Sequence, residues 1–121
     1  MLSGIRVLIV EDEALVAATL AEAVLDAEGE VVGIARSVGE ARRMIKQLTF
    51  DVAVLDIHLC DGEVTPVLEA LHARRAPTMV YSGGELPAKV RERHPELVAL
   101  RKPALPGRIL AEILRARRKG A

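Results

Sequence analysis

The chain has 121 residues, a length that fits one domain with a single hydrophobic core. Half of the residues are hydrophobic and 28% are charged, which argues against a disordered chain, and 17 basic residues balance 17 acidic ones. With no net charge, no apolar run near the roughly 20 residues of a membrane span and only one cysteine, we expect a cytoplasmic protein that binds neither membrane nor nucleic acid directly.

Five short apolar runs without a polar face predict parallel strands that are covered on both sides. In chain order they cover residues 5–10, 30–35, 51–56, 77–82 and 96–101.

Longer amphipathic stretches alternate with these runs and predict helices. They cover residues 13–29, 37–48, 64–75 and 104–119. The first should end at Gly29, and the second should begin at Ser37, whose hydroxyl can cap the helix while Glu40 reaches back to it. Residues 83–96 hold two glycines and two prolines around a polar segment, so we expect a single loose turn there.

Strand and helix alternate along the whole chain. This order predicts an α/β fold, a right-handed doubly wound sheet of five parallel strands with helices on both faces. We find no linker or repeat and expect residues 1–121 to form one domain.

Polar residues stand where four of the predicted strands end. Glu11 and Asp12 follow the first strand, Asp56 ends the third, Ser82 ends the fourth and Lys102 follows the fifth. Ligands of open parallel sheets bind beyond the carboxyl ends of the strands, so these side chains should share one site.

Three carboxylates at one edge would repel each other, and a hard divalent cation such as Mg²⁺ relieves that repulsion. Lys102 adds a positive charge and Ser82 a hydroxyl, which together suit a phosphoryl group. Asp56 could then act as a nucleophile that forms an acyl phosphate, with charge on the transferred group neutralised by the cation and Lys102.

The chain resembles the receiver domain of two-component response regulators over essentially its whole length. The resemblance rests on "VLIVEDE" (residues 7–13), "DVAVLDIHLCDG" (51–62), "YSG" (81–83) and "LRKP" (100–103). It implies a flavodoxin-like, CheY-like fold with strand order 2-1-3-4-5.

The resemblance also assigns roles to the site residues. Asp56 would accept a phosphoryl group from a histidine kinase or phosphotransfer protein, and Asp12 would bind Mg²⁺ directly, with Glu11 acting largely through water. His58 would offer its backbone carbonyl to the metal. Ser82 would bind the phosphoryl group through its hydroxyl, and Lys102 would form an ion pair with it.

Three positions depart from the family pattern. Cys60 replaces a usual proline, Ala99 replaces the aromatic switch residue, and Ala104 replaces a common phenylalanine. Tyr81 should point to the face opposite Ser82. We therefore expect output to run through rearrangement of residues 83–94 rather than through an aromatic ring.

We expect a stand-alone receiver that is not an enzyme in the usual sense and signals by phosphorylation-dependent protein contacts. The alternative is a non-phosphorylated interaction module whose last helix serves as a partner or homodimer surface. Other classes fit less well. A dinucleotide fold needs glycines after the first strand, a haloacid-dehalogenase-type phosphatase needs an acid at His58, and a transition-metal site at His58 and Cys60 lacks a third ligand.

Overall fold

The computed structural model describes residues 2–59 and 62–120, and Cys60 lies outside the described residues. Its centre is a parallel sheet in the order β2-β1-β3-β6-β7. The strands are β2 (Glu30–Ala35), β1 (Arg6–Val10), β3 (Val52–Leu55), β6 (Thr78–Ser82) and β7 (Val98–Arg101). Because β6 and β7 are the fourth and fifth predicted strands, the predicted order 2-1-3-4-5 is confirmed.

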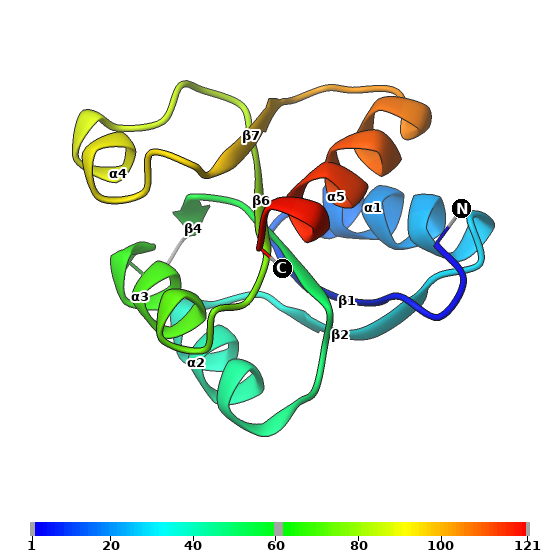
Figure 1. The fold of residues 1–121 in the computed structure, drawn as a ribbon, viewed down its shortest axis with the longest axis horizontal. Helices are drawn as coiled ribbons and strands as arrows, with labels where there is room; N and C mark the ends of the chain where they lie inside the picture. Colours follow the sequence, from blue (N-terminus) through cyan, green and yellow to red (C-terminus); the bar gives the residue numbers. More distant parts are fainter. Residues whose placement is uncertain (1, 60–61, 121) are drawn as a thin grey trace.

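Helices cover both faces of the sheet, as predicted (Figure 1). The helices α1 (Ala14–Asp26) and α5 (Pro106–Gly120) lie on one face. On the other face lie α2 (Val38–Gln47), α3 (Thr65–Ala73) and α4 (Ala88–Arg93). None of the described helices has the length and apolar character that a bilayer span requires.

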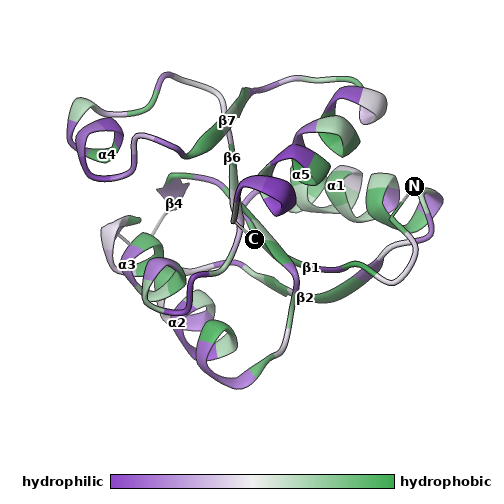
Figure 2. Cartoon of the chain, viewed as in Figure 1, coloured by the Kyte–Doolittle hydropathy of each residue, from purple (hydrophilic) through white to green (hydrophobic). Residues whose placement is uncertain are grey.

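The central strands bury side chains on both faces because their residues alternate between two cores. In β1, Val7 and Ile9 pack toward α1 and α5, whereas Leu8 and Val10 pack toward α2 and α3. All four residues of β3 are buried as well. Figure 2 shows these strands as the hydrophobic centre of the chain. Burial on both faces of the sheet therefore explains why the sequences of these strands are unbroken apolar runs.

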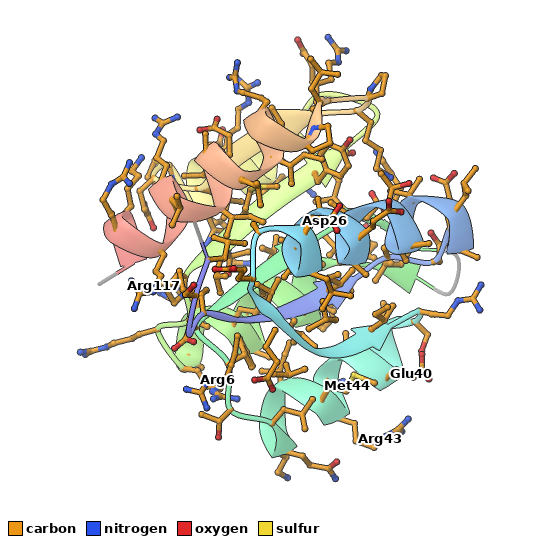
Figure 3. The ribbon with its side chains drawn as sticks, turned by 90° about the vertical axis from the view of Figure 1, so that its right-hand side faces the viewer. Arg6, Asp26, Glu40, Arg43, Met44 and Arg117 are labelled. Carbon is orange, nitrogen blue, oxygen red and sulfur yellow. The ribbon has the colours of Figure 1, made fainter. Side chains whose placement is uncertain are left out.

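The start of α2 is held by local hydrogen bonds close to those predicted. The Ser37 hydroxyl accepts a hydrogen bond from the Glu40 N–H at 3.1 Å, and the Glu40 carboxylate accepts one from the Arg36 N–H at 2.8 Å. Figure 3 shows Met44 between α2 and β2 and Arg43 projecting outward. The capping sequence therefore fixes where α2 begins.

The end of α1 differs from the prediction in detail. The helix ends at Asp26, and Glu28 rather than Gly29 takes the left-handed conformation, with φ at 68°. Gly29 is needed for another reason, because a Cβ there would lie 2.9 Å from Cγ1 of Val24. The glycine permits close packing rather than an unusual backbone angle.

One small element was not predicted. Strands β4 (His58–Leu59) and β5 (Gly62–Glu63) pair antiparallel directly after β3. Two-residue strands are too short to leave a periodic pattern in the sequence.

The helix α4 is packed more sparsely than the others. It has six residues, and Val90 is the one buried among them. The adjoining strand β7 buries only Val98. The predicted loose turn is thus a short helix anchored by a single side chain.

Candidate functional site

The fold places the predicted site residues along one edge of the sheet. Glu11 and Asp12 directly follow β1, and Asp56 directly follows β3. The strand β6 ends at Ser82, and Lys102 directly follows β7. Residues up to 91 positions apart in the sequence therefore meet at the carboxyl ends of adjacent strands.

Three carboxylates form the centre of this edge. One oxygen each from Glu11, Asp12 and Asp56 lies within 4.8 Å of the others, and the first and last of these residues are buried. The Asp12 carboxylate makes no hydrogen bond or ion pair with any residue that the structure describes. This edge therefore carries more negative charge than its surroundings neutralise.

Lys102 is a cation shared by two of these acids, Glu11 and Asp56, and by Glu13. Its Nζ lies 2.8 Å from Glu11 Oε1, 3.3 Å from Asp56 Oδ2 and 3.5 Å from Glu13 Oε1. Burial lowers the pKa of Lys102, but the pairs with Glu11 and Asp56 outweigh burial and raise it above its ordinary value. The lysine therefore stays charged.

Of the three acids, Glu11 has the environment least favourable to a charged carboxylate. Its Oε2 accepts a hydrogen bond from the Glu13 N–H at 3.2 Å. Its Oε1 is buried and lies 2.8 Å from Lys102 Nζ, and this ion pair is its one polar contact among the described residues. Burial and the neighbouring Asp56 raise the pKa of Glu11 to about 7, against the opposing pull of Lys102.

The Asp56 carboxylate is held by backbone and side chain together. Its Oδ1 accepts a hydrogen bond from the His58 N–H at 3.0 Å, and its Oδ2 faces Lys102. The side chain of His58 is exposed. The role of the His58 carbonyl as a metal ligand stays a prediction.

Ser82 lies beside this group on β6. Its side chain is buried, and its Oγ accepts a long hydrogen bond of 3.5 Å from the Gly84 N–H. Its carbonyl accepts a hydrogen bond from the Lys102 N–H at 2.9 Å, which ties the ends of β6 and β7 together. Because the Ser82 hydroxyl donates no hydrogen bond to any described residue, its proton is available to another acceptor.

Sequence reasoning left two supporting residues out of the site. Glu13 supplies the N–H that holds Glu11 and a second carboxylate for Lys102. Arg36 donates from Nη2 to the Asp12 carbonyl at 3.3 Å. The position of Glu13, directly after the acidic pair, was the signal available for it, and for Arg36 the signal was its place directly after the second predicted strand.

Ala99 leaves open space next to Ser82. A hollow of about 220 Å³ there is lined by both residues and by Leu86. Tyr81 lies on the other face, as predicted, where its hydroxyl accepts a hydrogen bond from the Ala104 N–H at 3.0 Å. The chain's one tyrosine therefore does not fill this space.

The acidic cluster fits a divalent cation of the Mg²⁺ type. Carboxylate oxygens that already lie within 4.8 Å of one another could hold one such ion directly or through bridging water. The unpartnered Asp12 carboxylate and the Glu11 Oε1 atom are the ligands that such an ion would satisfy. Oxygen-only donors also match a hard cation.

Comparisons with known proteins agree with this geometry, although no family model matches the chain. The protein-glutamate methylesterase/protein-glutamine glutaminase 5 of Myxococcus xanthus is 37% identical over 89 residues, which are 70% of this chain. The chain spans about a quarter of that protein, since the match covers 26% of it.

Solved structures match over nearly the whole chain. The signal receiver domain of a modulated diguanylate cyclase from Desulfovibrio desulfuricans is 27% identical with a TM-score of 0.83, covering 96% of this chain and 95% of that one. A CheY-like response regulator receiver domain from Methanospirillum hungatei is 25% identical with a TM-score of 0.82, covering 99% and 97%. Together with the sheet order and the placement of Glu11, Asp12, Asp56, Ser82 and Lys102, these likenesses identify the chain as a CheY-like response regulator receiver domain.

Proposed function

We propose that this domain accepts a phosphoryl group on Asp56 from a histidine kinase or phosphotransfer protein and signals through phosphorylation-dependent protein contacts. The observation that carries the proposal is the convergence of Asp56 with two further carboxylates and the shared cation Lys102 at one edge of the sheet. A structural ion pair needs one acid, whereas Lys102 contacts three, Glu11, Asp56 and Glu13.

The transfer step balances within this geometry. An oxygen of the Asp56 carboxylate attacks phosphorus, the new O–P bond forms as the P–N bond of the donor phosphohistidine breaks, and the electron pair leaves on the imidazole. Oδ1 is oriented by the His58 N–H, which leaves Oδ2, on the Lys102 side, as the nucleophile.

Residues of this chain can bind the transferred group. Lys102 lies 3.3 Å from Asp56 Oδ2 and can follow the added negative charge, and the Ser82 hydroxyl can donate to a phosphoryl oxygen. Glu11 and Asp12 would hold Mg²⁺ with Asp56. When bound, the ion neutralises charge on the phosphoryl oxygens.

The domain is not proposed to be an enzyme that turns over a separate substrate, since the group acted on is its own Asp56. The downstream partner is proposed to be a protein that distinguishes the phosphorylated form.

Intact mass after incubation with Mg²⁺ and acetyl phosphate tests the proposal. Wild type should gain one phosphoryl group, and Asp56→Asn should gain none. Asp26→Asn is the matched control, because Asp26 is an exposed residue at the end of α1 (Figure 3). A folded wild type that stays unmodified would instead favour a non-phosphorylated interaction module.

A further inference from the structure

A second hollow lies at the opposite end of the sheet from Asp56. It has a volume of about 310 Å³ and adjoins Thr78 and Val98, the residues at which β6 and β7 begin. The candidate site lies where the same strands end, about 13 Å away at about 3.3 Å per residue. The two sites share no residue among those that the structure describes.

The hollow has an apolar floor. Leu68, Val98 and Ala116 are almost fully buried and come from α3, β7 and α5. Its volume is at the lower end of the range for small-molecule pockets. An apolar floor of this kind favours a ligand with a hydrocarbon or aromatic body over an inorganic ion.

The rim of the hollow is basic. Arg75, which follows α3, and Lys119, in the last turn of α5, both line it, and among the described residues neither side chain pairs with an acid. The imidazoles of His72 and His94 meet edge to face, 5.6 Å between ring centroids, while Glu96 is the one acid on the described rim. Figure 2 shows the last turn of α5 as hydrophilic. Two unpaired cations beside apolar surface favour an anionic ligand.

The conformation of Arg75 follows from how α3 ends. This residue has φ at 56°, the left-handed region that is common at the end of a helix. The Arg75 N–H donates to the His72 carbonyl and the Ala76 N–H donates to the Leu71 carbonyl, each at 2.9 Å. This helix end places the Arg75 side chain on the rim.

We propose that this hollow binds a small organic anion, with an apolar body on the floor and a carboxylate or phosphate group between Arg75 and Lys119. The site is separate from the phosphoryl-acceptor site and does not depend on phosphorylation. Because His94 caps the end of α4, a bound ligand would also contact the most sparsely packed helix.

Two-dimensional NMR titration of the full chain tests the proposal, with benzoate and phenyl phosphate as probes. At least one probe should give saturable shifts confined to residues 68–78, 94–98 and 116–119. Benzyl alcohol, which lacks the charge, and inorganic phosphate, which lacks the apolar body, should bind at least about tenfold more weakly. The two anionic probes distinguish a carboxylate site from a phosphate site.

Arg75→Gly and Lys119→Gln should each weaken binding about tenfold. The glycine variant should fold normally, because it relieves the positive φ. Glu28→Gly is its matched control, since Glu28 has a φ of 68° at the end of α1 and does not line the hollow. Thermal unfolding verifies the fold of each variant.

Failure of this site is separable from failure of the proposed phosphorylation. Asp56→Asn should bind the probe as wild type does. Absence of saturable shifts with both anions, equal binding of benzyl alcohol, or undiminished affinity in Arg75→Gly would each overturn the inference.

Discussion

The centre of the sheet and its β7 edge are built differently, although both contribute to one site. The strands β1, β3 and β6, which position Glu11, Asp12, Asp56 and Ser82, bury nearly all of their residues. The strand β7 buries one of its four residues, and in α4 beside it Val90 is the one buried residue. The comparison indicates that the acidic cluster and Ser82 lie on a rigid platform, whereas the edge that carries Lys102 has room to move.

The largest loss of stability is expected when a buried side chain is shortened in the central strands. Ile9→Ala removes a fully buried side chain from β1 and should lower the free energy of unfolding by about 2–5 kcal/mol. Urea denaturation measures this. Leu25→Ala, at a side chain that is 59% exposed, is the matched control and should stay within about 0.5 kcal/mol of wild type. Equal losses in both variants would contradict the comparison.

The pH dependence of stability should report on Glu11. Its pKa is about 7 in the folded chain and 4.5 ordinarily, so between these values the folded state holds a proton that the unfolded state has lost. In EDTA, stability from this group is therefore present below pH 4.5 and lost as pH rises to about 7, by at most about 3 kcal/mol. Urea denaturation at pH 5 and pH 8 should show a smaller fall in Glu11→Gln.

Mg²⁺ should counteract the loss of stability that occurs as the pH rises. At pH 8 the ionised carboxylates offer a cation site, so Mg²⁺ should raise the stability of wild type more than that of Glu11→Gln or Asp12→Asn. An identical Mg²⁺ response in all three proteins would contradict a metal site at these residues.

Shortening a buried side chain to alanine in α4 should lower stability less than it does in β1. Val90→Ala removes about two methylene equivalents from a side chain that is 8% exposed, which corresponds to about 1–2 kcal/mol at most. If Val90→Ala destabilises as much as Ile9→Ala, α4 is not the weaker region.

Hydrogen exchange locates the difference within the native state. Amides of residues 83–94 should exchange faster than those of β1, and Mg²⁺ with beryllofluoride, a phosphoryl mimic, should change protection across that segment. Unchanged protection there would refute output through this segment. Asp56→Asn is the control, since it should not respond to the mimic.

The smallest effect is expected at the ion pair that links α4 to α3. Arg93 Nη1 lies 3.5 Å from Glu69 Oε2, and both side chains are more than half exposed. Arg93→Gln should therefore change stability by no more than about 0.5 kcal/mol, measured by thermal unfolding. A larger loss would mean that surface charge, not Val90, holds α4 in place.

Much of this architecture could be predicted because burial on both faces leaves unbroken apolar runs. The strand order followed from the family resemblance, and the placement of Asp56 and Lys102 followed from the rule that parallel strands present their carboxyl ends at one edge. The cap at Ser37 was likewise readable, since it depends on neighbours three residues apart.

The remaining features depend on packing between distant segments. Gly29 is required by its distance to Val24, which no local pattern records. The left-handed Glu28 and Arg75 are set by how their helices end against the rest of the fold, and neither residue type indicates such a conformation. The contact of Arg36 with the Asp12 carbonyl joins two loops and has no sequence motif.

The position of Lys102 among the acids has a consequence for the cell. Its ammonium group already sits 2.8 Å from one carboxylate and 3.3 Å from another, as a built-in counter-ion. Removal of Mg²⁺ is therefore expected to leave the domain folded, so that under the proposed function a shortage of the ion would stop phosphoryl transfer reversibly without unfolding the protein.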